Sequence, residues 1–177
     1  MKSFFSIRET SYCAVFVAFI TAGAYISFPI GPVPIVLQNF FILLASLFLK
    51  PRLMLLTIVV YLFAGLIGLP VFSGGKSGII HFLGPTGGFL LSYIPASFLA
   101  SLFRNKTKFN FYFSSVGASL IFIIVVYSIG VSWMIPTFGF NKSVYFGLIP
   151  FIIPDVIKAA AAIAIDKTLS NKILTHD

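Results

Sequence analysis

The sequence predicts an all-α membrane protein, a compact bundle of six transmembrane helices with both termini on the cytoplasmic side. Three observations support this fold class. Hydrophobic residues occupy 59% of the 177 positions and charged residues only 9%, whereas about 25% of a soluble domain is charged. The apolar residues form six runs, separated by clusters of proline, glycine and polar residues. Most of the cations lie beside alternate ends of these runs, as membrane topology requires.

The six runs are expected to be the spans of a single transmembrane domain that covers residues 1–177. A crossing of the hydrocarbon core takes roughly 20 apolar residues, so the chain has no room for a separate soluble catalytic domain. The second run is short for a crossing. The expected spans lie near residues 11–28, 36–49, 53–69, 87–103, 111–134 and 144–165.

Turn-forming and charged residues mark the end of each expected span. Proline, glycine and charged side chains interrupt apolar helices and mark the connections between them. The N-terminal segment is basic, but no small-residue cleavage site follows it, so the first span is expected to be retained rather than removed as a signal peptide. The sixth span runs into a basic tail, and the five breaks before it lie at residues 29–34, 50–52, 70–85, 104–110 and 136–142.

The distribution of cations predicts the orientation. With a cytoplasmic N-terminus, nine of the twelve lysines and arginines lie on the cytoplasmic side, which the positive-inside rule favours. Lys76 and Lys142 fall in outer loops, and Lys158 falls within the last span. The net charge of +8 therefore reflects topology, and no continuous basic groove indicates nucleic-acid binding. The cytoplasmic cations are Lys2, Arg8, Lys50, Arg52, Arg104, Lys106, Lys108, Lys167 and Lys172.

One pair of opposite charges lies inside an apolar run. Asp155 and Lys158 are three residues apart, so on a helix they share a face and each compensates the other where water is scarce. The other three acidic residues flank the spans. An ionisable pair inside the membrane predicts a functional site, and the alternative is an ion pair that only fixes helix packing. Pro150 and Pro154 predict an irregular outer end of this span.

The outer loop between the third and fourth spans is the part of the chain richest in glycine. Its sequence Gly75-Lys76-Ser77 resembles the end of a phosphate-binding loop, but Pro70 stands where the first glycine of that motif belongs. A nucleotide site is therefore excluded. The loop is either a lid, whose permissive backbone closes over a ligand, or an ordinary flexible connection.

Two further features, Gln38 and a stripe of alanines, each have two possible interpretations. The cysteine and histidine residues indicate no metal site. Gln38, near the outer start of the second span, hydrogen-bonds either a ligand or a neighbouring helix. The stripe of Ala14, Ala18 and Ala22 lets another helix pack closely, either within the chain or from another subunit. The single cysteine is buried in the first span, and His81 has no second metal-ligating residue nearby, so no metal is expected.

Four segments taken together resemble one known family. They are Gly31-Pro32-Val33-Pro34-Ile35 with Leu37-Gln38, then Gly68-Leu69-Pro70-Val71-Phe72, Gly84-Pro85-Thr86-Gly87-Gly88 and Pro154-Asp155-Val156-Ile157-Lys158-Ala159. Their order and their spread over most of the chain resemble BioY, the substrate-binding S component of energy-coupling factor (ECF) biotin transporters. Each segment alone would be a weak match.

The resemblance implies high-affinity uptake of biotin by a multi-pass protein of the prokaryotic cytoplasmic membrane. Biotin would bind in a pocket that opens outward. The implied partners are the lipid bilayer, a transmembrane coupling protein and two cytoplasmic ATPases. Because the ATPases would hydrolyse ATP, this chain is not expected to be an enzyme or to need a cofactor. The stripe of Ala14, Ala18 and Ala22 would meet the coupling protein.

The resemblance also assigns site residues by motif position. Asp155 would accept hydrogen bonds from the ureido N–H groups of biotin, and Lys158 would meet either its carboxylate or its ureido carbonyl. Lys76 departs from the small polar residue common in the family loop, and it either reaches the carboxylate or points to water. The other assignments are Gln38 at the pocket mouth, Phe72 and Tyr93 as walls, and Gly74, Gly75, Gly84, Thr86 and Gly87 in the lid.

Three other functions compete with biotin uptake through an ECF complex. An S component for another vitamin would share the architecture, because specificity depends on a few pocket side chains. A solitary biotin transporter would lack the ATPase partners, and sequence alone does not separate it from the first hypothesis. An intramembrane enzyme would need a nucleophile with a base, or a metal set, inside the spans, and neither is present.

Overall fold

The computed structural model describes residues 6–107 and 110–174, with side chains up to residue 168. Lys2, Lys108 and Asp177 therefore lie outside the described residues, as does the side chain of Lys172. The elements in chain order are α1 (Ile7–Tyr25), β1 (Ser27–Phe28), β2 (Ile35–Val36), α2 (Gln38–Phe48), α3 (Pro51–Leu66), α4 (Ile80–Leu83), α5 (Gly87–Lys106), α6 (Phe111–Phe138), α7 (Phe140–Gly147), the 3-10 helix η1 (Ile149–Phe151) and α8 (Ile152–Leu174).

Local sequence explains where several helices begin. Ser6 caps α1 through a capping box in which its hydroxyl accepts from the Glu9 N–H and the Glu9 carboxylate accepts from the Ser6 N–H, so two otherwise unpaired donors are satisfied. Pro51 occupies the first turn of α3, where its missing N–H is not needed. Gly139, with a φ of +76°, allows the sharp change of direction from α6 into α7.

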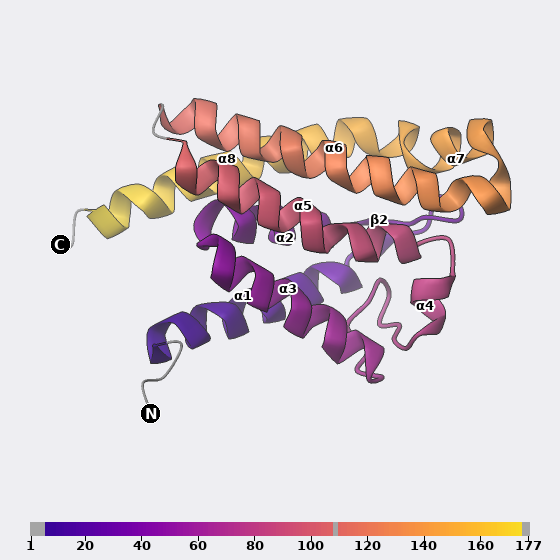
Figure 1. Cartoon of the computed structure of the whole chain (residues 1–177), viewed down its shortest axis with the longest axis horizontal. Helices are drawn as coiled ribbons and strands as arrows, with labels where there is room; N and C mark the ends of the chain where they lie inside the picture. The colour runs from indigo at the N-terminus through magenta and orange to yellow at the C-terminus, as the bar shows by residue number, and fades with distance from the viewer. Residues whose placement is uncertain (1–5, 108–109, 175–177) are drawn as a thin grey trace.

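The helices lie roughly along one long axis, and the ends of the bundle differ (Figure 1). Both described ends of the chain lie at one end of the bundle, together with the α2–α3 and α5–α6 connections. The short helix α4 and the helix α7 lie at the opposite end. Arg8, Lys50, Arg52, Arg104 and Lys106 consequently gather at the first end, because all of them flank those connections or termini.

Helix lengths vary more than six regular spans would require. Within the described residues, two helical stretches are long and apolar enough to cross a membrane, Phe111–Phe138 and Phe140–Thr168. The helices α2 and α3 are apolar but have only 11 and 16 residues. The prediction of a mainly helical protein with a short second helix agrees with this structure.

Non-helical backbone occupies the end of the bundle that also holds α4. The strands β1 and β2 pair antiparallel, with Ser27 opposite Val36 and Phe28 opposite Ile35. Sequence analysis missed this hairpin, because two residues per strand leave no alternating pattern. The last apolar run is broken between α7 and α8, as Pro150 and Pro154 predict, and regular helix resumes at Ile152. Irregular backbone at membrane depth is tolerated where it lines a cavity.

A second buried ion pair corrects one expectation. Asp166, predicted to lie in the polar zone beside the last span, is only 1% exposed. Its Oδ2 lies 3.2 Å from Nη2 of Arg104, whose Nη1 donates to the Ser114 hydroxyl at 3.1 Å. The guanidinium also lies over the Phe111 ring, 4.7 Å from its centroid. This cluster joins α5, α6 and α8 near their basic ends.

Candidate functional site

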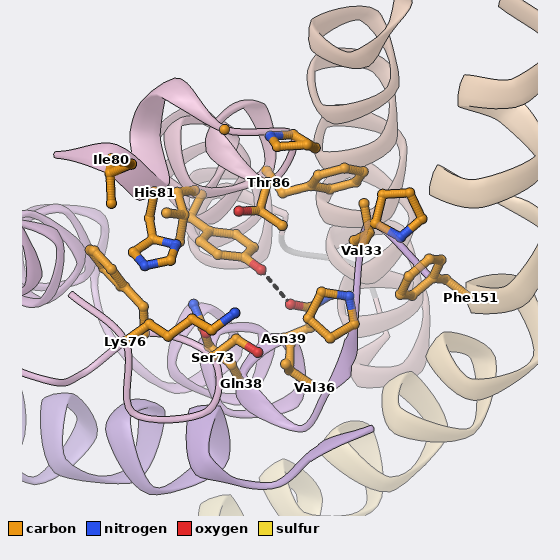
Figure 2. Close-up of a pocket in the computed structure, with 18 of the residues that line it drawn as sticks. Val33, Val36, Gln38, Asn39, Ser73, Lys76, Ile80, His81, Thr86 and Phe151 are labelled. Carbon is orange, nitrogen blue, oxygen red and sulfur yellow. Dashed lines mark hydrogen bonds between the residues drawn. The ribbon is translucent and has the colours of Figure 1, made fainter. Parts of the chain in front are cut away.

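A cavity of about 330 Å³ opens among α2, α5, α6 and the non-helical segments. Its size is at the lower end of the range for small-molecule sites, about 300–1,000 Å³. Figure 2 shows its lining. The lining residues are Pro32, Val33, Pro34, Val36, Gln38, Asn39, Phe72, Ser73, Lys76, Ile80, His81, Gly84, Pro85, Thr86, Phe89, Leu90, Tyr93, Tyr127 and Phe151.

Two adjacent amides at the start of α2 give the cavity its polar centre. The Tyr93 hydroxyl donates to Asn39 Oδ1 at 2.5 Å, the bond drawn as a dashed line in Figure 2. Gln38 is only 2% exposed, and its Nε2 has no hydrogen-bond partner among the described residues. An unpaired buried donor is costly unless a ligand satisfies it. Gln38 therefore lies inside the cavity wall and not at the mouth, where sequence analysis placed it.

The aromatic walls include both residues that sequence analysis selected. Phe72 and Tyr93 line the cavity and are 2% and 4% exposed. The Phe72 ring meets Tyr61, His81 and Phe82 edge to face, and the Tyr93 ring stacks parallel to Phe122. These contacts hold the rings in fixed orientations, so the cavity is largely formed before any ligand enters.

The Asp155–Lys158 pair lies directly behind the cavity wall. Lys158 Nζ is 2.8 Å from Asp155 Oδ1, which confirms the predicted pairing, and it also donates to the Val36 carbonyl at 2.9 Å. The Tyr127 hydroxyl donates to Asp155 Oδ2 at 2.6 Å. Neither charged residue is among the lining residues, whereas Val36 and Tyr127 are. The pair thus reaches the cavity through these two neighbours.

The segment between α3 and α5 closes one side of the cavity in two parts. The first is a tight turn in which the Phe72 N–H donates to the Lys76 carbonyl, with Gly74 and Gly75 at φ values of +69° and +75°. Such values strongly favour glycine. Ser73 and Lys76 extend from this turn into the cavity lining.

The tight turn is attached to the C-terminal end of α1. The Gly74 N–H donates to the Ala24 carbonyl at 3.0 Å, and the Ser27 and Ser73 hydroxyls are 2.8 Å apart. The Tyr25 hydroxyl donates to the Pro70 carbonyl at 2.7 Å. Two of these bonds come from the last turn of α1 and the third from β1, and together they attach this part of the chain to the loop that carries Ser73 and Lys76.

The second part of the segment is α4 with the connection into α5. Gly84 and Thr86 line the cavity, and the Gly84 carbonyl accepts from the Trp133 indole N–H at 3.1 Å. Trp133 thus holds this connection onto α6. Gly87 does not line the cavity but is buried at the start of α5.

Replacing Gly87 by alanine is expected to destabilise the protein by about 1–3 kcal/mol, the range for overpacked sites. A Cβ there would lie 1.9 Å from the Phe82 carbonyl oxygen, and backbone cannot move aside as a flexible side chain can. Gly84→Ala is the matched control, because its Cβ would meet no atom closer than 3.4 Å. Thermal unfolding in detergent should show a lower Tm for Gly87→Ala alone; equal Tm values would contradict this account.

The stripe of Ala14, Ala18 and Ala22 faces outward from α1. All three side chains are exposed, whereas Phe16 and Ile20 on the same helix are buried in the core. Of the two interpretations left open by sequence, packing of this stripe inside the chain is therefore wrong.

Sequence analysis assigned no role in the site to the polar lining residues Asn39, Ser73 and Tyr127. Asn39 follows Gln38 directly, and an amide pair at a helix start was a usable signal. Tyr127 lies within an apolar helix of 28 residues with little periodicity, so nothing in the sequence indicates which way its hydroxyl points. Only the packing of α6 against α8 brings Tyr127 to Asp155.

Comparisons with known proteins agree with one family along nearly the whole chain. The model of the BioY family matches residues 1–174. A probable biotin transporter BioY of Pyrococcus horikoshii is 44% identical over 164 residues, which cover 93% of this chain and 97% of that protein. The biotin transporter BioY of Thermotoga maritima is 35% identical over 158 residues, covering 88% and 92%.

A solved structure extends the agreement to three dimensions. The crystal structure of the S-component for biotin from an ECF-type ABC transporter matches this one with a TM-score of 0.85 and 32% sequence identity, covering 93% of this chain and 92% of that chain. Sequence and fold therefore lead to the same assignment: the chain belongs to the BioY family.

Proposed function

We propose that this membrane protein binds biotin and serves as the biotin-specific S component of an ECF-type transporter. The observation that carries the proposal is the preformed cavity whose buried Gln38 donor has no partner, in a chain of the BioY family. Proteins similar to this chain are biotin transporters and an S-component for biotin, which supports the same substrate here.

The chemistry of the cavity suits the parts of biotin. The ureido ring offers two N–H donors and a carbonyl acceptor, so it needs both kinds of partner in one place. Gln38 supplies an unpaired donor, and the Tyr127 oxygen, whose proton points to Asp155, keeps its lone pairs for an N–H group. Phe72 and Tyr93 offer apolar surface to the sulfur-containing ring.

Asp155 and Lys158 contribute to binding as a charged pair that positions the polar groups at the ureido end of the cavity. Asp155 accepts the hydrogen bond of the Tyr127 hydroxyl and so leaves the Tyr127 oxygen free to accept one from the ligand. Lys158 donates to both Asp155 and the Val36 carbonyl. Asp155 becomes a direct acceptor for a ureido N–H if a bound ligand displaces the Tyr127 hydroxyl. Because the pair is buried, its charges act through a low local dielectric.

Calorimetric titration of the purified, detergent-solubilised protein tests the substrate directly. We expect saturable binding of biotin and no binding of thiamine or riboflavin, because neither of those vitamins matches the arrangement of donors and acceptors. Binding of thiamine or riboflavin with no heat from biotin would instead support an S component for another vitamin.

The proposed membrane arrangement is six crossings with both termini on the cytoplasmic side of a prokaryotic cytoplasmic membrane. The gathering of Arg8, Lys50, Arg52 and Arg104 at one end of the bundle supports it, since cytoplasmic ends are enriched in cations. The cavity and its glycine-rich lid, including Gly74, Gly75, Gly84, Thr86 and Gly87, then face outward.

The proposed partners are a transmembrane coupling protein and two cytoplasmic ATPases, which would hydrolyse ATP for this chain. The exposed stripe of Ala14, Ala18 and Ala22 supports close packing with a helix of the coupling protein. The bonds from Tyr25 and Ala24 to the lid turn would carry movements of α1 to the cavity. A solitary biotin transporter remains the second candidate, because the cavity would look the same.

Replacing Ala14 and Ala18 together by leucine is expected to block assembly with the coupling module and to spare biotin binding. Larger side chains prevent the close approach that small residues allow, and both positions point away from the core. The matched control is Ala160→Leu with Ala161→Leu, two exposed alanines on α8. Co-purification of the coupling protein and ATPases measures assembly; normal recovery with the α1 variant would contradict this role.

A further inference from the structure

One end of the cavity carries a positive charge that no described lining residue balances. Among the described lining residues, Lys76 is the only cation and none is aspartate or glutamate. Within the described part of the chain, the Lys76 ammonium has no ion-pair or hydrogen-bond partner, since the two ion pairs there are Arg104–Asp166 and Lys158–Asp155. A cavity of this kind favours an anion.

His81 lies at the same end of the cavity as Lys76. Figure 2 shows both side chains on one side, opposite Val33 and Phe151. The imidazole meets the Phe72 ring edge to face, with centroids 6.2 Å apart, and this contact limits its orientation. Partial burial, and then the charge of Lys76, lower the pKa of His81 below its ordinary value of 6.5. His81 is therefore neutral at pH 7 while the cavity is empty.

We propose that Lys76 and His81 together form the subsite for the carboxylate of the ligand, and that His81 takes up a proton from solvent as the carboxylate binds. This inference rests on the proposed function and deepens it, because it assigns the acidic tail of biotin to the loop end of the cavity. The ureido ring then lies toward Gln38 and Tyr127, and the tail extends to the lid.

The direction of the pH dependence follows from the charges. A carboxylate beside His81 stabilises the imidazolium, so the pKa of His81 is higher in the complex than in the empty protein. Affinity for the anion therefore rises as pH falls through the pKa of the complex and levels off below the pKa of the empty protein. A carboxylic acid of pKa about 4.3 stays ionised down to about pH 5.5, so the effect is expected between about pH 8 and that limit.

Among the residues that the structure describes, no other side chain facing this end has an ordinary pKa in the same range. The remaining titratable residues of the lining are Tyr93 on α5 and Tyr127 on α6, and Tyr25 of α1 packs against Gly75 in the turn. Phenols have an ordinary pKa of about 10, outside the pH range of the test. The Asp155–Lys158 pair lies behind the wall at the opposite, ureido end of the proposed pose.

The test compares biotin with its uncharged primary amide in calorimetric titrations of the full-length protein between about pH 8 and pH 5.5. We expect affinity for biotin to rise several-fold over this range, and heats measured in two buffers of different ionisation enthalpy to report proton uptake. The amide should bind more weakly, with no pH dependence and no proton uptake. His81→Gln should remove the pH dependence of biotin binding. Lys76→Gln should weaken the binding of biotin by about tenfold without weakening the binding of the amide.

Lys142→Gln is the control, because Lys142 is an exposed cation on α7 that does not line the cavity; its pH profile should equal that of the unmodified protein. Equal affinities for biotin and its amide, or a pH dependence that persists in His81→Gln and His81→Asn, would overturn the subsite alone. Absence of binding by both ligands at every pH would overturn the proposed function and the subsite with it.

Discussion

Replacing Lys158 by methionine is expected to weaken biotin binding by roughly a hundredfold, the effect of losing a charge-assisted hydrogen bond inside a protein. Methionine keeps most of the side-chain volume and removes the ammonium that holds Asp155 Oδ1 and the Val36 carbonyl. The Asp155 carboxylate then stays buried with only the Tyr127 hydroxyl, so its charge disturbs the polar end of the cavity. Calorimetric titration with biotin measures the loss.

A double variant separates binding from stability. Breaking a buried ion pair typically destabilises by about 3–5 kcal/mol, because one charge is left uncompensated, whereas removing both charges is much better tolerated. Asp155→Asn combined with Lys158→Met should therefore recover the Tm that Lys158→Met loses but not the affinity. Recovery of both would mean that the pair only fixes helix packing. Lys142→Met, on exposed surface, is the control for loss of a cation.

Tyr127→Phe distinguishes the two ways in which Asp155 can act. If the Tyr127 oxygen is the acceptor for a ureido N–H, removing it should weaken biotin binding by about tenfold. If Asp155 binds the ureido group directly, the phenylalanine variant frees Oδ2 from its present donor, and affinity should stay the same or rise. Titration with biotin decides between these outcomes.

Replacing Gln38 by leucine is expected to raise the Tm of the empty protein slightly and to weaken biotin binding by about tenfold or more. The Gln38 Nε2 is buried without a partner in the described part of the chain, so the empty protein carries a desolvation penalty that leucine removes. The bound state loses a donor to the ligand. A substitution that raises the Tm but lowers the affinity indicates that the original residue serves binding and not stability.

Asn39→Leu is the matched comparison, because it removes the neighbouring amide on the same turn of α2. Asn39 Oδ1 accepts from the Tyr93 hydroxyl, so its loss leaves a buried donor unpaired and should lower the Tm as well as the affinity. A lower Tm for Gln38→Leu together with unchanged affinity would show that Gln38 is a packing residue.

The mainly helical class and the break at Pro150 and Pro154 could be predicted because they depend on composition and on local backbone chemistry. The Asp155–Lys158 ion pair could be predicted as well, since a spacing of three residues places two side chains on one helical face wherever that helix packs. The family assignment depends on four short motifs in order, and it too is a property of the sequence.

Other features depend on residues far apart in the chain. The burial of Asp166 depends on Arg104, 62 residues away, and the bond from Tyr127 to Asp155 spans 28 residues. The position of Gln38 within the wall depends on the short β1–β2 hairpin, which shows no sequence periodicity. None of these distances can be read from local patterns, because each is set by how whole helices pack.

The sequence by itself determined that this protein is apolar and mainly helical, where its charges are concentrated, and to which family it belongs. Only the tertiary structure decided which polar groups meet. It placed Asp155 and Lys158 one layer behind the cavity, left the Gln38 donor unpaired inside it, and brought Lys76 and His81 to its loop end. The physical reason is that hydropathy and helical periodicity act over a few residues, whereas a binding cavity is formed by side chains from distant segments that share one buried space.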